Sequence, residues 1–124
     1  MKINTGTDII EIERIKNSIE ETDRKFCEKV YTEKEIEYCE SKKLQKYQHY
    51  AARFAAKEAV FKAVSNNLED KYDLGWKDIE ILNDENGRPY VNKNKLKDIV
   101  EFEDIDISLS HCKQYAIATV VILN

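Results

Sequence analysis

Small and apolar residues recur at helical spacing over residues 47–64, a stretch that contains many alanines and neither glycine nor proline. Alanine is the strongest helix former, so the stretch predicts one long helix. Two stripes lie on opposite sides of this helix: Tyr47, Ala51, Phe54, Ala55 and Phe61 on one side, and Ala52, Ala56, Ala59 and Ala63 on the other. A helix that is apolar on two sides is packed on two sides, so we expect it at the centre of the fold.

Before this helix the pattern predicts one strand and three short helices. Residues 3–10 alternate between two sets of side chains, as a strand does. Short helical patterns follow at residues 11–19, 23–31 and 32–41. The last of these opens with Thr32 and Glu35, the spacing of a capping box, in which each side chain bonds the backbone amide of the other residue.

After the long helix the pattern changes to short strands. Residues 78–82 and 88–91 predict two strands, joined by a turn that contains Asn86-Gly87. A short helix at residues 93–102 and two strands at residues 105–110 and 115–123 complete the chain. In the first of these strands Ile105, Ile107 and Leu109 alternate with polar residues and are expected to face inward. Helices dominate the first half and strands the second, so we expect an α+β fold in which an antiparallel sheet packs on the long central helix.

Composition narrows the class of protein. The chain has 124 residues, 42% hydrophobic and 35% charged, which fits one globular domain over residues 1–124. The net charge of −4 argues against a nucleic-acid binder, which needs a basic surface. Neither a membrane span nor the apolar core of a signal peptide is visible, so we expect a cytoplasmic protein. Cys27, Cys39 and Cys112 have no CxxC spacing and are expected to be free thiols.

Three residues break the local patterns in a way that suggests chemistry. Asp8 lies in a predicted strand, where aspartate is disfavoured, and Glu58 lies in an apolar helical stripe with Lys62 one turn later. Asp8 as a helix cap and Glu58–Lys62 as a surface pair are the plainer interpretations. Two carboxylates from separate elements, with a lysine nearby, suit Mg²⁺ shared with substrate phosphates. The residues thus indicate a magnesium-dependent phosphoryl-type transferase or a phosphate-ester binder.

A group of basic residues lies near the start of the chain, interspersed with glutamates. Its members are Arg14, Lys16, Arg24, Lys25 and Lys29. A solvated face of mixed charge is the ordinary interpretation, and a docking surface for an acidic protein is the alternative.

Four motifs together resemble a known family. Gly6-Thr7-Asp8-Ile9, Arg53-Phe54-Ala55-Ala56-Lys57-Glu58-Ala59 with Lys62, Asn86-Gly87-Arg88-Pro89 and Ser108-Leu109-Ser110-His111 have the order and spacing of the holo-[acyl-carrier-protein] synthase family, the short type of 4′-phosphopantetheinyl transferase. The resemblance covers essentially the whole chain. The chain departs from the family at residues 65–67, where Ser-Asn-Asn replaces a glycine-rich turn that helps to form the wall of the coenzyme A pocket.

The resemblance implies a phosphopantetheinyl transferase-like fold and a defined reaction. Such enzymes move the 4′-phosphopantetheine arm of coenzyme A onto a serine of apo acyl carrier protein and release adenosine 3′,5′-bisphosphate. It implies these roles: Asp8 and Glu58 as ligands of Mg²⁺, Glu58 and Lys62 as catalytic residues, Lys62 on the phosphates, Arg53, Gly87, Arg88, Pro89 and His111 around the nucleotide, and Arg14, Arg24, Lys25 and Lys29 in carrier docking. It also implies a homotrimer with sites between neighbouring copies.

A second hypothesis of a different class is a non-catalytic module that binds coenzyme A or a nucleotide. Such a module would bind without turnover and would not need Asp8. The presence of both Asp8 and Glu58 favours the enzyme, because a pure binder has little use for a desolvated carboxylate.

Overall fold

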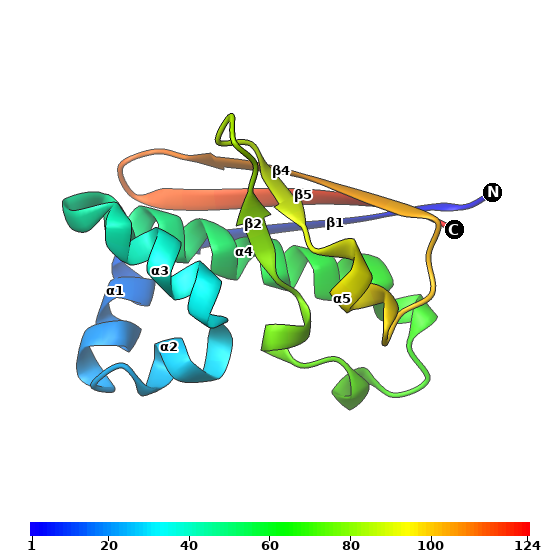
Figure 1. Cartoon of the computed structure of the whole chain (residues 1–124), viewed down its shortest axis with the longest axis horizontal. Coiled ribbons are helices and arrows are strands. Elements are labelled where there is room, and N and C mark those ends of the chain that lie inside the picture. Colours follow the sequence, from blue (N-terminus) through cyan, green and yellow to red (C-terminus); the bar gives the residue numbers. More distant parts are fainter.

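The computed structural model describes residues 1–124, and its central element is the long helix α4, Lys46–Val64. The helix begins one residue before the predicted stretch and ends where predicted. In Figure 1 it runs lengthwise along the strands of a sheet, with the other helices gathered on the side away from that sheet. The two small or apolar stripes are largely buried, so the expectation of a helix packed on two sides is confirmed.

One side of α4 packs against a three-stranded antiparallel sheet. Its strands are β1 (Ile3–Glu11), β5 (Tyr115–Leu123) and β4 (Asp104–His111), in the order β1-β5-β4. The last strand of the chain therefore lies in the middle of the sheet. On β4 the predicted inward set is confirmed, since Ile105 and Ile107 are buried and Leu109 packs against the core.

A separate two-stranded ribbon, β2 (Ile81–Asn83) with β3 (Pro89–Val91), crosses in front of α4 (Figure 1). Its first strand begins later than the predicted residue 78, because Trp76–Asp78 forms a 3₁₀ turn in which the Asp78 carboxylate accepts the Gly75 amide at 2.8 Å. Helix α5 (Lys93–Lys97) is shorter than predicted. The chain leaves it so that Val100 and Phe102 both enter the core.

Three helices cover the other side of α4, near its N-terminal half. They are α1 (Ile12–Glu21), α2 (Lys25–Val30) and α3 (Glu33–Ser41). The capping box of Thr32 and Glu35 is present as predicted. Helix α2 begins at Lys25 rather than at residue 23, because Asp23 and Arg24 both have positive φ angles, 50° and 73°. The 3₁₀ turns are η1 (Lys43–Gln45), η2 (Ser65–Asn67), η3 (Lys71–Asp73) and η4 (Trp76–Asp78).

The core consists of two adjoining apolar clusters on the two sides of α4. One joins α4 to the sheet and to the β2–β3 ribbon, and the other joins it to α1, α2 and α3. Cys27 and Cys39 are buried in the second cluster, Cys112 is exposed, and all three are free thiols as expected. No helix is long and apolar enough to cross a bilayer.

The closest packing of α4 on the sheet is at Gly6 of β1. A Cβ atom at this position would overlap the carbonyl oxygen of Ala59 and would lie 3.0 Å from the Ala63 amide nitrogen. These are main-chain atoms of α4, which cannot rotate away as a side chain would. Glycine at residue 6 and alanine at residues 59 and 63 therefore allow strand and helix to touch almost backbone to backbone.

We expect Gly6→Ala to lower the free energy of unfolding by roughly 1–3 kcal/mol, because the added methyl group must push β1 and α4 apart. Urea denaturation followed by circular dichroism measures the effect. Gly75→Ala is the control, since its Cβ meets only a side-chain atom, a carboxylate oxygen of Asp78 at 3.3 Å, and no main chain. Equal stability of Gly6→Ala and the parent would contradict the close-packing argument.

Candidate functional site

Asp8 and Lys62 meet where β1 crosses α4. Asp8 lies on the inward side of its strand with Gly6, and its carboxylate accepts a hydrogen bond from Lys62 Nζ at 3.1 Å. The same ammonium group donates to the Thr7 carbonyl at 2.9 Å. Lys62 is thus paired with Asp8 rather than with Glu58. Glu11, whose side chain makes no cap bond, occupies the N-cap of the next helix, so Asp8 is not that cap.

Glu58 is a half-buried carboxylate in the same place. Burial raises the pKa of Glu58, the negative charge of Asp8 raises it further, and Lys62 opposes both effects. Two carboxylates that repel each other in a partly desolvated site are stabilised by a cation between them. No third histidine, cysteine or acidic side chain joins them. This donor set of two hard oxygen ligands fits Mg²⁺, which keeps several waters and often shares its remaining positions with phosphate.

The carboxylates of Asp8 and Glu58 line one cavity of about 420 Å³. Its other walls come from β1, α1, α2 and α4: Ile9, Ile10, Arg14, Ile15, Ser18, Phe26 and Phe54. The cavity therefore combines two carboxylates with mostly apolar walls and one arginine. Of the four residues predicted for carrier docking, Arg14 lines this cavity, and Arg24, Lys25 and Lys29 are exposed on and just before α2.

The residues predicted around the nucleotide gather on the other side of α4, near the β2–β3 ribbon. Gly87 has a φ of 83° and nothing lies within 4 Å of a Cβ built there, so the turn is open to solvent. Arg88 is exposed and lies 3.7 Å from the Asp106 carboxylate. Asp84 shapes the turn by accepting the amides of Asn86 and Arg88, each at 2.9 Å. Pro89 begins β3.

Arg53 does not reach the surface of the molecule, although the sequence predicts it near the nucleotide. It is only 2% exposed. Its guanidinium donates to the Asn83 side-chain oxygen at 2.5 Å and lies over the Tyr38 ring, 4.3 Å from the centroid, while its Nε has no partner. Asn83 in turn donates to the Gly87 carbonyl at 2.9 Å. This geometry favours a role in which Arg53 braces the turn.

His111 is exposed at the end of β4, and a histidine that the sequence analysis missed lies beside it. The rings of His49 and His111 are 6.3 Å apart. Burial, with the nearby positive charges of Arg53 and Lys42, lowers the pKa of His49 to about 4, so this imidazole is neutral at pH 7. The sequence could have indicated His49, because it precedes Arg53 by one helical turn and so lies on the same face of α4.

Within one chain the predicted site residues thus form two groups. Asp8, Glu58 and Lys62 lie where α4 meets β1, which is one edge of the sheet. His111 and Arg88 lie toward β4, which is the opposite edge. The body of α4 and the central strand β5 separate the two groups.

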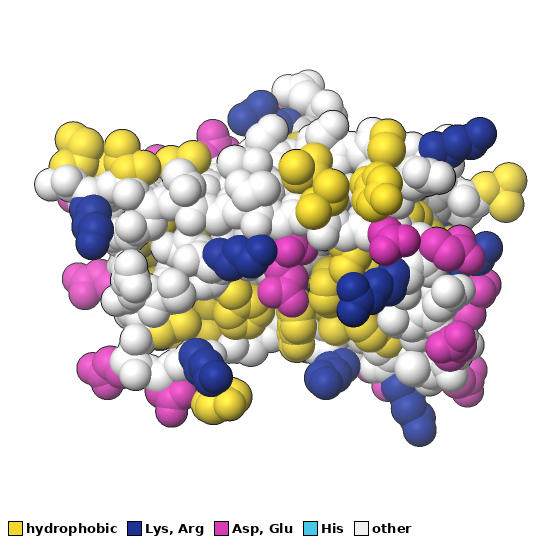
Figure 2. All heavy atoms as spheres, turned by 180° about the vertical axis from the view of Figure 1, so that it is seen from behind, with side chains coloured by type: hydrophobic (Ala, Val, Ile, Leu, Met, Phe, Trp, Pro, Cys, Tyr) yellow, Lys and Arg dark blue, Asp and Glu magenta, His cyan; other side chains and the backbone are white.

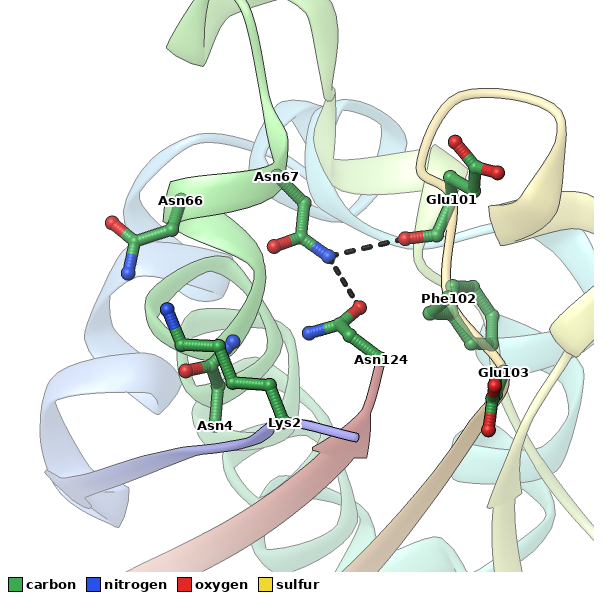
Figure 3. Close-up of a pocket in the computed structure, with 8 residues that line it drawn as sticks. All are labelled: Lys2, Asn4, Asn66, Asn67, Glu101, Phe102, Glu103 and Asn124. Carbon is green, nitrogen blue, oxygen red and sulfur yellow. Dashed lines mark hydrogen bonds between the residues drawn. The ribbon is translucent and has the colours of Figure 1, made fainter.

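A larger cavity, of about 520 Å³, lies elsewhere, where the end of α4 meets both chain termini (Figure 3). Asparagine side chains from three segments line much of it, and Asn67 donates to the Asn124 side chain at 2.7 Å and to the Glu101 carbonyl at 3.1 Å. Phe102 is its only hydrophobic lining residue. Because it lacks the carboxylate pair and the associated lysine, it is not the candidate catalytic site.

Comparison with known proteins agrees with the resemblance seen in the motifs. Residues 4–120 match the model of the 4′-phosphopantetheinyl transferase superfamily. The chain belongs to this superfamily. Among relatives of this transferase, the holo-[acyl-carrier-protein] synthase of Ruminiclostridium cellulolyticum is 53% identical over 129 residues, which cover 98% of this chain and 92% of that protein. The holo-[acyl-carrier-protein] synthase of Protochlamydia amoebophila is 43% identical, with 98% of each chain covered.

Solved structures confirm the predicted fold of the transferase. The Helicobacter pylori holo-[acyl-carrier-protein] synthase in complex with coenzyme A superposes with a TM-score of 0.80 at 31% identity, covering 95% of this chain and 98% of that one. The Bacillus anthracis enzyme, solved in complex with coenzyme A (3′,5′-ADP), gives a TM-score of 0.77 at 32% identity and covers 96% and 94%. The predictions of family, α+β fold and transferase class are therefore confirmed.

Proposed function

We infer that this chain, as one domain over residues 1–124, transfers the 4′-phosphopantetheine moiety of coenzyme A to a serine of apo acyl carrier protein and releases adenosine 3′,5′-bisphosphate. Family membership supports the reaction. The observation that carries the site is the meeting of Asp8, Glu58 and Lys62 from two distant segments at one cavity. Free thiols, two of them buried, are consistent with a protein of the cytoplasm.

In this reaction the serine oxygen forms a bond to the phosphorus that carries the pantetheine arm. The bond from that phosphorus to the bridging oxygen breaks, and the bisphosphate leaves with the electron pair. Asp8 and Glu58 would hold Mg²⁺, which when bound would neutralise charge on the pyrophosphate. The ammonium group of Lys62 adds positive charge beside the same phosphates. Glu58 lies in the same cavity, where its carboxylate would be in place to accept the serine proton as the new bond forms.

The first test measures the reaction and the metal site in parallel. With magnesium and coenzyme A, the parent chain adds one pantetheine arm to apo carrier protein, seen by intact mass. Glu58→Gln abolishes the addition and keeps the parent's circular dichroism spectrum. In a thermal melt, Mg²⁺ raises the midpoint of the metal-free parent by about 2–4 °C, and this rise is lost in Asp8→Asn.

Asp98→Asn is the matched control for the melt, because Asp98 is an exposed aspartate at the end of α5. It retains the full response to Mg²⁺. A mass shift with Glu58→Gln equal to that of the parent would remove Glu58 from the catalytic site. A magnesium response that survives Asp8→Asn would remove Asp8 from the metal site.

We propose that the working form is a homotrimer, and the outer face of the three-stranded sheet supports an assembly of copies. Such a face is usually polar. Here five large hydrophobic side chains of β1 and β5 are exposed on it: Ile3 and Ile9 (both 60%), Tyr115 and Val121 (both 43%) and Ile117 (37%). Figure 2, which views the molecule from behind, shows hydrophobic side chains exposed on that side among single charged ones. Large apolar side chains gathered on one face of a sheet favour an interface there.

The separation of the two groups of site residues supports shared sites in this assembly. A neighbouring copy that presents Arg88 and His111 to the cavity of Asp8 and Glu58 would complete a site that one chain leaves divided. In this arrangement each copy supplies the metal-binding half of one site and the nucleotide-binding half of another.

Sharing predicts that two inactive variants complement each other. Glu58→Gln and the double variant Arg88→Ala/His111→Ala are inactive alone at low coenzyme A. After co-refolding at equal amounts, about a quarter of the sites receive both intact halves, and activity returns to about a quarter of the parent value. The intact-mass assay measures it. Continued inactivity of a mixture that forms mixed oligomers would show that each site lies within one chain.

The basic residues beside the cavity are proposed to dock the carrier. Arg14 lines the cavity of Glu58, and the turn with positive φ angles at Asp23 and Arg24 leads into α2, which carries Lys25 and Lys29. An acidic partner seated here would place its serine next to the carboxylates.

Reversing one of these charges is expected to weaken carrier binding. Lys29→Glu raises the KM for carrier protein by roughly fivefold at low salt, less at high salt, and leaves the KM for coenzyme A unchanged. Lys71→Glu, on the exposed turn at residues 71–73, is the control and changes neither constant. A carrier KM that ignores both Lys29→Glu and ionic strength would place docking elsewhere.

A further inference from the structure

Helix α4 carries a buried cation that the reaction does not use. Lys57 is completely buried, and its ammonium group donates to three acceptors: Glu35 Oε1 at 2.8 Å, the Trp76 carbonyl at 2.9 Å and the Ile79 carbonyl at 2.5 Å. An ammonium group has three protons, so each is paired. Two of the three acceptors belong to the main chain that leads into β2.

Glu35 extends this set of contacts to β2 itself. Its second oxygen accepts the Ile81 amide at 2.9 Å, and its first also accepts the Thr32 amide at 2.9 Å in the capping box. Helix α3, helix α4 and the segment from Trp76 to Ile81 are thereby joined at one buried ion pair. Both side chains of the pair have no exposed surface.

A further pair of hydrogen bonds links α4 to the turn at residues 83–88, which the proposed function places around the nucleotide. One helical turn before Lys57, Arg53 holds Asn83, and Asn83 holds the Gly87 carbonyl. The residues at positions 76, 79, 81 and 83 are therefore all bonded to side chains of α3 or α4. β2 and β3 pair with each other over only three residues each. Glu80, just before β2, adds bonds from the Thr32 hydroxyl at 2.6 Å and the Asn92 side chain at 2.9 Å, so the other ties of this segment lie at α3 and at the residue after β3.

Stability alone does not require such a pair. Buried ion pairs can often be replaced by apolar side chains of similar size with no loss of stability, because desolvation offsets most of their attraction. What an apolar replacement cannot supply is a donor for the Ile79 and Trp76 carbonyls or an acceptor for the Ile81 amide. Without these partners the segment before β2 has to shift toward water, and the turn at residues 83–88 shifts with it.

We propose that Lys57 and Glu35 are positioning residues for coenzyme A, whose ion pair sets the placement of the 83–88 turn relative to α4. The proposal rests on the proposed role of that turn at the nucleotide. The carboxylate pair has its own support, because Asp8 comes from β1 and Glu58 from α4, and Lys62 of α4 binds Asp8 directly at 3.1 Å. Loss of the pair thus affects donor binding more than the chemical step.

The test compares Lys57→Met with the double variant Lys57→Met/Glu35→Leu. Both are expected to raise the KM for coenzyme A about tenfold and to keep kcat within about threefold of the parent. The double variant recovers most of the unfolding free energy that Lys57→Met loses, because it leaves no unpaired buried carboxylate. Its KM nevertheless stays raised. If Lys57→Met does not fold, the double variant alone provides the kinetic test.

Lys46→Met is the matched control, because Lys46 is a partly exposed lysine of the same helix with a 3.3 Å ion pair to Glu40. It leaves the KM for coenzyme A unchanged. A second donor, 3′-dephospho-coenzyme A, sharpens the comparison. The parent binds this donor more weakly than coenzyme A, because the 3′-phosphate belongs to the nucleotide around which the turn is proposed to lie. The double variant shows a smaller difference between the two donors, because its displaced turn has already lost part of its contact with the nucleotide.

A purely structural role gives a different result: lower apparent kcat from a smaller folded fraction, with an unchanged KM, or a KM that recovers together with stability in the double variant. Either outcome would overturn the proposal. Arg88→Ala separates this failure from that of the proposed function. If Arg88→Ala raises the KM and the Lys57 variants do not, the positioning proposal alone is wrong. If Arg88→Ala also has no effect, the turn is not the nucleotide site.

Discussion

The fold and the site both depend on how closely β1 approaches α4. At Gly6 the strand comes against the helix backbone at Ala59 and Ala63, with no side chain between them. Two residues further along the strand, this same approach brings Asp8 within hydrogen-bonding reach of Lys62 and beside Glu58. A wider crossing would separate the carboxylates and leave Glu58 facing a solvated groove.

The second constraint on the molecule is electrostatic. Helix α4 has one acidic side chain, Glu58, and several basic ones, and their charges are neutralised to different extents. Glu58 is partly buried and lies near another negative charge, and both effects raise its pKa, whereas Lys57 is enclosed by acceptors and a carboxylate. The carboxylate of Glu58 lies in a cavity and is available to a ligand. The ammonium group of Lys57 lies in the interior and binds main-chain carbonyls. Neighbouring residues of one motif thus have opposite physical roles.

Much of this could be predicted from local pattern. The alanine-rich periodicity predicted α4 to within one residue, alternation predicted β4 with its buried face, and a long apolar run predicted β5. Predictions failed where the main chain depends on distant partners. The start of β2 is set by the 3₁₀ turn at residues 76–78 and by contacts to Lys57 and Glu35, which lie far away in sequence. Periodicity cannot show such contacts.

The site was predictable in part for the same reason. Asp8 and Glu58 were visible because each contradicts its local environment, and the structure brings them together. Arg53 was expected at the nucleotide but not in the interior, and Lys57 was given no role, because a basic residue in a helix is ordinary until its burial is known. His49 was missed although its spacing to Arg53 pointed to it.

The division of site residues between the two sides of α4 has a consequence for how activity responds to the amount of protein. Where a complete site needs two copies, dilution below the dissociation constant of the assembly silences the enzyme while every chain stays folded. Output then rises more steeply than in proportion to the number of chains. A change in the synthesis or degradation of the chain would therefore change the total activity by a larger factor than it changes the amount of protein.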